Sequence, residues 1–181
     1  ASARKGMRTA EQDSLARLDL EASLAIAPEN QAVLATIGND LLASSKPDEA
    51  IPYFDRVLAL NPNVSEALHN RGYAHLLAGR YDAAIADLEE TLELNADFAY
   101  AHNNLGWAHH MKGDETAALH SIDRSIAMDP NNAYAHYNRG IVLHSLGRTA
   151  EACQSWTQAL ERGFRIGYGN AVDLEMEQHC K

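Results

Sequence analysis

The sequence predicts an all-α solenoid in which antiparallel helix pairs stack on one another, and three observations support this prediction. Glycines recur every 34 residues, at Gly38, Gly72, Gly106 and Gly140. Alanines keep the same step, at Ala50, Ala84, Ala118 and Ala152. Between them run apolar stripes at helical spacing. A repeat of this length cannot bury its apolar face alone, so it is stable only when stacked against copies of itself.

The period divides the chain into four full units with a partial unit at each end. The full units span residues 31–64, 65–98, 99–132 and 133–166. We expect residues 1–10 to form a flexible N-terminal segment and residues 11–30 to form a half-repeat or capping helix, because they match only the second helix of a unit. Residues 167–181 are expected to form a C-terminal cap, since terminal units need an altered outer surface for solubility.

Each unit is predicted to be a helix pair closed by a tight turn. The turn residues are Ser45, Gly79, Gly113 and Gly147, in the same place in successive units. Pro28, Pro62 and Pro130 close the units, because a proline just past a helix prevents its continuation. Ala96 and Phe164 break this proline series, so those junctions are expected to be softer.

The second helix of each unit carries an apolar stripe that we interpret as core. The stripe residues are Ile51, Phe54 and Leu58; Ile85, Leu88 and Leu92; Leu119, Ile122 and Ile126; and Cys153, Trp156 and Leu160. The recurring alanines between them let neighbouring helices approach. A bulky residue at Ala118 should therefore overpack the interface by about 1 to 3 kcal/mol.

Each unit meets a family pattern in part, and in the third unit the matching residues are Leu105, Gly106, His109, Gly113, Ala118, Ile122, Ser125 and Pro130. On these residues the chain resembles the tetratricopeptide repeat family over roughly residues 11–166. The resemblance implies a right-handed superhelical solenoid whose concave face is lined by the first helix of each unit. Arg71 and Arg139 depart from the pattern, because the family usually has leucine before the glycine.

The concave row can be predicted from helical spacing, and it supplies the candidate peptide-binding residues. They are Asn70, Tyr73, Asn103, Asn104, Trp107, His110, Tyr137 and Asn138. Leu76 falls in the same row.

Asparagines stand at one place in three successive units, at Asn70, Asn104 and Asn138. Asparagine offers both an acceptor and donors, so such a ladder could pair with the main chain of an extended peptide. It is similar to the asparagine ladder of O-linked N-acetylglucosamine transferases. The alternative interpretation is that asparagine merely suits a polar, exposed helix face.

Aromatic residues add a second feature to the row. Tyr73, Trp107 and Tyr137 are typical anchors for a bound chain, and the alternative for such residues is packing between neighbouring first helices.

Asn39 and Asn70 fit the asparagine places of the repeats that bind chaperone C-termini. However, Ala35, Tyr100 and Asn104 stand where the cations of those repeats are needed, so binding of a charged chaperone tail is disfavoured.

Composition narrows the class of partner. The formal net charge is −10, with 25 acidic and 15 basic residues in 181. None of the predicted helices supplies the basic surface that nucleic-acid binding requires, and no apolar run approaches the roughly 18 residues needed to cross a bilayer. A protein or peptide partner that is basic or neutral is expected.

No catalytic, metal or cofactor site is predicted. The nine histidines show no metal-ligand spacing, and the chain has no phosphate loop and no nucleophile elbow. We therefore predict a noncatalytic scaffold without a cofactor, which binds an extended segment of a partner protein. The alternative function is a structural spacer or a self-assembly module.

The two cysteines leave two interpretations open. Cys153 takes the place of the apolar residues Ile51, Ile85 and Leu119, so it could be a buried small hydrophobe. It could also form a disulfide with Cys180 that fixes the cap. The polar start without an initiator methionine fits removal of a signal peptide or truncation, and we favour a periplasmic or secreted bacterial location.

Overall fold

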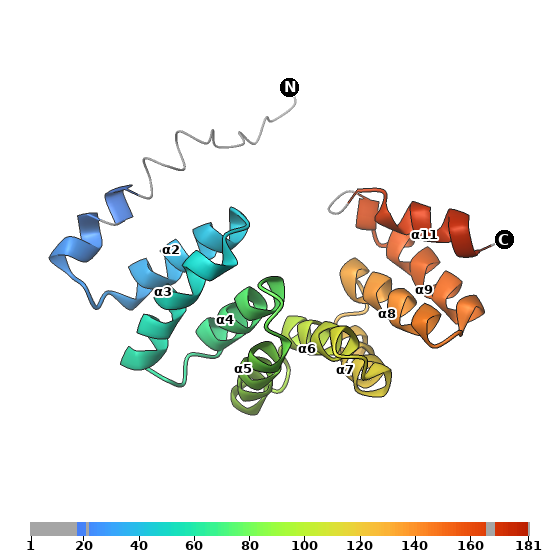
Figure 1. Ribbon diagram of the computed structural model, residues 1–181, viewed down its shortest axis with the longest axis horizontal. Coiled ribbons are helices and arrows are strands. Elements are labelled where there is room, and N and C mark those ends of the chain that lie inside the picture. The colour runs from blue at the N-terminus through green and yellow to red at the C-terminus, as the bar shows by residue number, and fades with distance from the viewer. Residues whose placement is uncertain (1–17, 21, 166–168, 181) are drawn as a thin grey trace, which may run out of the picture.

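A computed structural model describes residues 18–20, 22–165 and 169–180, and in this part of the chain every regular element is a helix (Figure 1). The helices are α2 (Gln31–Ala43), α3 (Pro47–Leu60), α4 (Ser65–Leu77), α5 (Tyr81–Leu94), α6 (Ala99–Met111), α7 (Glu115–Met128), α8 (Ala133–Ser145), α9 (Thr149–Glu161) and α11 (Ala171–His179). Residues 18–20 and 22–26 are also helical. The predicted segment 1–10 lies outside the described residues.

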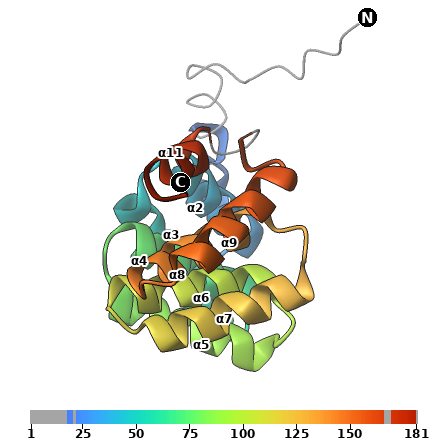
Figure 2. The same ribbon diagram turned by 90° about the vertical axis from the view of Figure 1, so that its right-hand side faces the viewer.

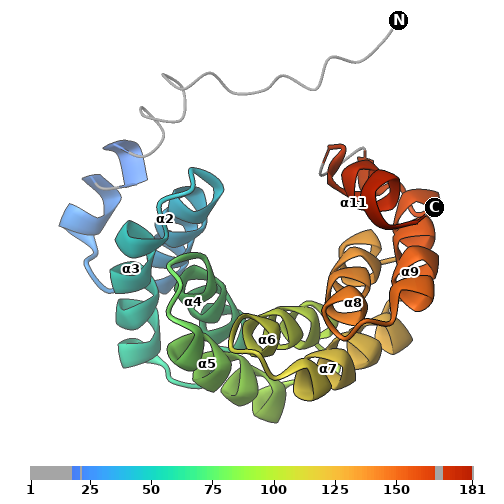
Figure 3. The same cartoon turned by 45° about the vertical axis from the view of Figure 1, so that its right-hand side comes forward.

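Successive helix pairs stack into an arc. The first helices α2, α4, α6 and α8 lie on its inner side, together with α11, and the second helices α3, α5, α7 and α9 lie on its outer side (Figure 3). Figure 2, which faces the C-terminal units, shows the same helices crossing one another in layers. The predicted all-α solenoid is therefore confirmed, and its concave face is formed by the first helices.

The first glycine series lies where the two helices of a unit cross. A Cβ built on Gly38 would lie 2.7 Å from the ring of Phe54, one on Gly106 would lie 2.5 Å from the side chain of Ile122, and one on Gly140 would lie 2.2 Å from that of Trp156. A real Cβ does not approach other atoms so closely. The 34-residue glycine step thus records the contact that holds each helix pair together.

The second glycine series lies in the turns between the two helices of each unit. Gly79, Gly113 and Gly147 have φ angles of 74°, 83° and 73°, which is the left-handed region that glycine occupies without steric cost. Ser45 stands in the same place in the first unit and also has a positive φ, 57°. The first unit therefore keeps the turn and carries the strain of a Cβ in that conformation.

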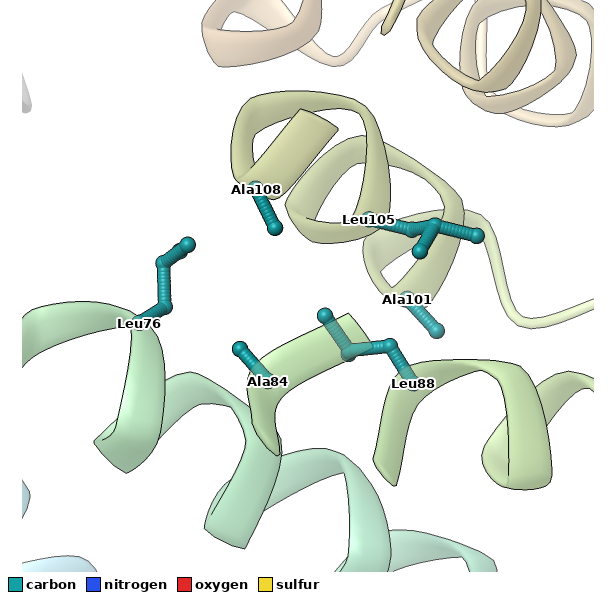
Figure 4. Close-up of a cluster of buried hydrophobic side chains, with 6 residues drawn as sticks. All are labelled: Leu76, Ala84, Leu88, Ala101, Leu105 and Ala108. Carbon is teal, nitrogen blue, oxygen red and sulfur yellow. The ribbon is translucent and has the colours of Figure 1, made fainter. Parts of the chain in front are cut away.

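The core between units consists of side chains from three helices. Leu76 of α4, Ala84 and Leu88 of α5, and Ala101, Leu105 and Ala108 of α6 form one buried cluster (Figure 4). The prediction that Leu76 belongs to the concave row is wrong, because α6 packs against Leu76 and buries it. All four recurring alanines are fully buried, as the core prediction requires.

The last described helix, α11, docks on the fourth unit. It packs against α9, and Val172 is buried among Leu143, Trp156 and Phe164. A disulfide joins Cys153 to Cys180, with the two Cα atoms 5.7 Å apart. The disulfide interpretation is therefore the one that the structure supports.

In α11 a leucine stands where the first helices of the four full units have the crossing glycine. Counting 34 residues on from Gly140 gives Leu174, which is 48% exposed. A leucine at this place does not allow the close helix approach that glycine allows in the full units. α11 thus lacks the crossing point on which the helix pairs are built.

Candidate functional site

The concave row is less open than its sequence pattern predicts. Asn70, Tyr73, Trp107, His110 and Tyr137 are partly exposed on α4, α6 and α8. Three of the candidate asparagines are buried: Asn103 is 1% exposed, Asn104 8% and Asn138 0%. The expected exposed ladder of Asn70, Asn104 and Asn138 is therefore not present, and the alternative of a polar, exposed helix face also fails for two of its three members.

Instead, the amides bond to one another. Asn138 Nδ2 donates to Asn103 Oδ1 (3.1 Å), Asn103 Nδ2 to Asn104 Oδ1 (3.5 Å), and Asn104 Nδ2 to His69 Nε2 (3.2 Å). His69 Nδ1 donates to Asn70 Oδ1 (3.1 Å), and Asn70 Nδ2 to Asn39 Oδ1 (2.9 Å). We call this chain of six side chains the amide relay.

The amide relay runs in one direction. Every contact between helices donates toward the N-terminal end of the array, and the relay crosses from α8 through α6 and α4 to α2. An asparagine amide has one acceptor oxygen and a donor nitrogen, so each residue can accept on one side and donate on the other. Chains of this kind are mutually strengthened by polarisation in a buried setting. The relay therefore links the first helices of all four units.

The relay ends where the repeat changes. His69 and Asn103 each donate to the asparagine that follows them, but in the fourth unit Tyr137 takes this place. Asn138 Oδ1 is accordingly buried with no hydrogen-bond partner among the described residues. Such an acceptor raises the free energy of the folded state, which marks the C-terminal end of the relay as its weakest point.

His69 is the one titratable member of the relay. Its ring stacks on Phe98 with centroids 4.6 Å apart. Burial lowers the pKa of His69 below the ordinary value of 6.5, although the hydrogen bond with Asn70 and the charge of Glu66 act in the opposite direction. The neutral ring with its proton on Nδ1 satisfies both neighbours at once.

The aromatic candidates fall into two groups. Tyr73 and Trp107 are partly buried against the cluster of Leu76 and its neighbours and keep an exposed part. The Trp107 ring lies 5.0 Å from that of His110, whose Nδ1 is 2.7 Å from Glu115 Oε2. These side chains are held in place by protein contacts before any partner is present.

Tyr137 belongs to the second group. Its ring centroid lies 4.6 Å from that of Phe164 and 6.4 Å from that of Tyr134, and burial raises its pKa. Tyr137 therefore packs against Phe164, which follows α9, and against Tyr134 of its own helix. Tyr100, at the start of α6, is 57% exposed.

The two arginines that depart from the family pattern join helices on the outer side. Arg71 of α4 makes two hydrogen bonds with Asp87 of α5, at 2.8 and 2.7 Å, and one with Asp55 of α3, at 2.8 Å. Arg139 bonds Asp123 and Ser155. Sequence reasoning missed these contacts, and the signal was present: each partner lies 16 residues from its arginine.

The charge of the inner layer follows from these pairings. Arg71 and Arg139 are the arginines within α2, α4, α6 and α8, which contain no lysine, and both are bonded to acidic or hydroxyl side chains of the outer helices. Asp40 and Glu66 add negative charge to the inner layer. The concave face is thus neutral to acidic.

Two further properties concern the described residues only. No cluster of three His, Cys, Asp or Glu side chains in this part of the chain could hold a metal ion. No helix in it combines the length and apolar character needed to cross a membrane.

Comparison with known families gives one consistent result. Models of the tetratricopeptide repeat match residues 36–92, 76–113, 99–132 and 122–154. Together they cover residues 36–154 without a gap, which is more than half of the 181-residue chain. No curated protein sequence matches the chain.

Solved structures share the fold at low sequence identity. A thermophilic TPR protein, TTC0263 of Thermus thermophilus, is 16% identical with a TM-score of 0.76 over 94% of this chain and 91% of that one. MamA from Desulfovibrio magneticus RS-1 is 21% identical with a TM-score of 0.76, over 87% and 88%. The first TPR of Spaghetti (RPAP3), bound to the HSP90 peptide SRMEEVD, is 23% identical with a TM-score of 0.62, over 65% and 93%.

Proposed function

This chain belongs to the tetratricopeptide repeat family, and from that premise we propose that it is a noncatalytic scaffold that binds an extended, neutral or basic segment of a partner protein along its concave face. The observation that carries the proposal is the pair Tyr73 and Trp107. These rings stand in equivalent places one unit apart, partly exposed, on first helices that the amide relay fixes relative to each other. Rigid aromatic side chains of this kind lose little entropy on binding.

The relay changes the role of the asparagines in this proposal. Because Asn103, Asn104 and Asn138 are buried and bonded to one another, their role is to set the spacing of the first helices. The residues left to contact the partner segment are Asn70, Tyr73, Trp107 and His110. Asn39 and Asn70 lie at the open N-terminal end of the relay, where a partner's polar groups can reach them.

Charge selects the partner. The RPAP3 relative was solved with a peptide ending in two glutamates, a valine and an aspartate. The inner helices of this chain offer no arginine or lysine that is free of an acidic partner or a buried hydroxyl. A desolvated carboxylate without a counter-ion is strongly unfavourable, so an acidic tail should not bind.

The test is capture of partner segments by the wild-type protein and by Trp107→Ala. We expect the substitution to weaken binding at least about tenfold, which corresponds to about 1.4 kcal/mol, while the circular dichroism spectrum stays helical. Leu94→Ala is the matched control, since Leu94 is exposed on an outer helix. It should bind as the wild type does.

The probes are short extended peptides with matched apolar residues that differ in charge, with SRMEEVD as the acidic member. Binding of the lysine- and arginine-containing peptides but not of SRMEEVD supports the proposal. Equal binding by Trp107→Ala would overturn the groove assignment. Self-association in light scattering without any peptide, unaffected by Trp107→Ala, would favour the spacer or self-assembly function.

A further inference from the structure

We propose that His69 is a pH-responsive joint in the amide relay, and that its protonation uncouples the first helix of the second unit from that of the third. The relay is a property of the chain alone. This proposal and the peptide-binding proposal can therefore fail independently.

Asn104 contacts the nitrogen of the His69 ring that carries no proton. Asn104 Nδ2 donates to the lone pair on His69 Nε2 across 3.2 Å. The other ring nitrogen, Nδ1, already carries a proton, which it donates to Asn70 Oδ1. An added proton must go to Nε2, because a neutral imidazole has one lone pair and here it is on that nitrogen. Two N–H groups would then face each other, and the bond between α4 and α6 would be lost.

The disturbance continues along the relay. To accept from a protonated His69, the Asn104 amide must turn its oxygen toward the ring. That oxygen is the acceptor for Asn103 Nδ2 in the neutral state, so Asn103 loses its partner as well. Because the contacts between helices all point the same way, one protonation reverses or breaks the contacts on its C-terminal side as far as Asn138.

The surroundings of His69 set the direction of the response. Glu66, one turn earlier on α4, favours the charged ring. The segment before α6 presents Phe98, α6 presents neutral Asn104, and α2 presents neutral Asn39 through Asn70. Within the described part of the chain, Glu66 is the charged group that acts on the ring, and burial opposes it. The relay should therefore be intact at neutral pH and should open with a midpoint below pH 6.5.

The third unit supplies a matched variant. Asn103 occupies the place of His69 one repeat later. It accepts from Asn138, 35 residues on, as His69 accepts from Asn104, and it donates to Asn104 as His69 donates to Asn70. His69→Asn therefore copies a contact that the protein already makes. It should preserve the relay and remove its response to pH.

The experiment is nitrogen-15 NMR of the side chains of the full chain between pH 8 and 5. In the wild type we expect the neutral His69 ring to be protonated on Nδ1, and the side-chain amide signals of Asn104 and Asn103 to titrate with the same midpoint as His69. In His69→Asn these amide signals should not titrate. Glu66→Gln should move the shared midpoint to lower pH, because it removes the charge that favours the protonated ring.

Three results would overturn the proposal. The first is an Asn104 amide that stays unchanged while His69 titrates. The second is an Asn104 amide that still titrates in His69→Asn with the wild-type midpoint. The third is that, in Glu66→Gln, the midpoint of the Asn104 amide does not shift together with that of His69. Because Glu66 is exposed, this variant should keep the fold even if His69→Asn does not.

Discussion

The second and third units have the same length, the same helix pairs and the same crossing glycine, yet they differ in chemistry at several aligned places. On the inner face the second unit has His69 where the third has Asn103. Behind it, the second has Arg71 where the third has Leu105. At these two places the second unit has a titratable and a charged side chain, whereas the third unit has two neutral side chains. Their common backbone shows that the repeat fixes positions, while the residue at each position decides what the unit responds to.

The residue that faces Arg71 on the second helix differs between the two units as well. Arg71 is bonded to Asp87, whose side chain is 9% exposed, whereas the residue equivalent to Asp87 in the third unit is Ser121. The Arg71 guanidinium has its pKa raised, chiefly by the hydrogen bonds with Asp87. A buried carboxylate needs this partner, and a leucine needs none. The two units are therefore alternative, internally consistent solutions, which experiments can exchange.

The largest effect is expected when only half of the exchange is made. Arg71→Leu removes two hydrogen bonds from the buried Asp87 carboxylate and leaves it only the more distant His75, at 3.9 Å, so it should reduce the free energy of unfolding by about 3 kcal/mol. The double variant Arg71→Leu, Asp87→Ser copies Leu105 and Ser121 and should recover most of the loss. Urea denaturation measures both, and a double variant no more stable than the single one would show that the units are not interchangeable.

Glycine at the crossing point gives the next effect. A Cβ on Gly106 would lie 2.8 Å from the backbone oxygen of Ala118, which cannot move aside, while the nearest atom to one on Gly72 is a leucine side-chain carbon at 3.0 Å. Gly106→Ala should cost about 1 to 3 kcal/mol by overpacking. For Gly72→Ala the higher helix propensity of alanine, about 0.5 to 1 kcal/mol, offsets a smaller clash.

Thermal unfolding of the two variants tests this difference. Equal loss of stability in Gly72→Ala and Gly106→Ala would mean that the two helix pairs cross with the same clearance, contrary to the structure.

The pH dependence of stability follows from the histidines. Burial lowers the pKa of His69, His75 and His136 below the ordinary value of 6.5. The unfolded chain therefore binds more protons than the folded one below that pH, so the free energy of unfolding should fall as the pH is lowered through and below 6.5. Well above it these groups contribute no slope.

Substitution by the residue of the third unit isolates one of these histidines. His69→Asn should lose less stability than the wild type between pH 7.5 and pH 5, as measured by the midpoint of urea denaturation. Identical slopes would show that His69 is protonated equally in both states.

The smallest effect concerns the exposed partner of Arg71. Asp55 is 54% exposed in its side chain, so its ion pair is screened by water. Asp55→Asn should cost less than about 1 kcal/mol. A loss as large as that of Arg71→Leu, in the same urea experiment, would mean that Asp55 rather than Asp87 is the main partner.

The sequence by itself determined the repeat, because the 34-residue step records where helices must touch. The crossing glycines, the buried alanines and the positive-φ turns all follow from contacts within a unit or with its neighbour.

Only the tertiary structure decided that most of the polar row is buried. Helical spacing places Asn103, Asn104 and Asn138 on the inner side, but it does not show how closely the next first helix approaches. That distance buries the amides and leaves them to satisfy one another, since a buried amide without a partner is costly. The relay, the arginine contacts 16 residues away and the docking of α11 on α9 all depend on neighbouring helices, which a single helix pattern does not contain.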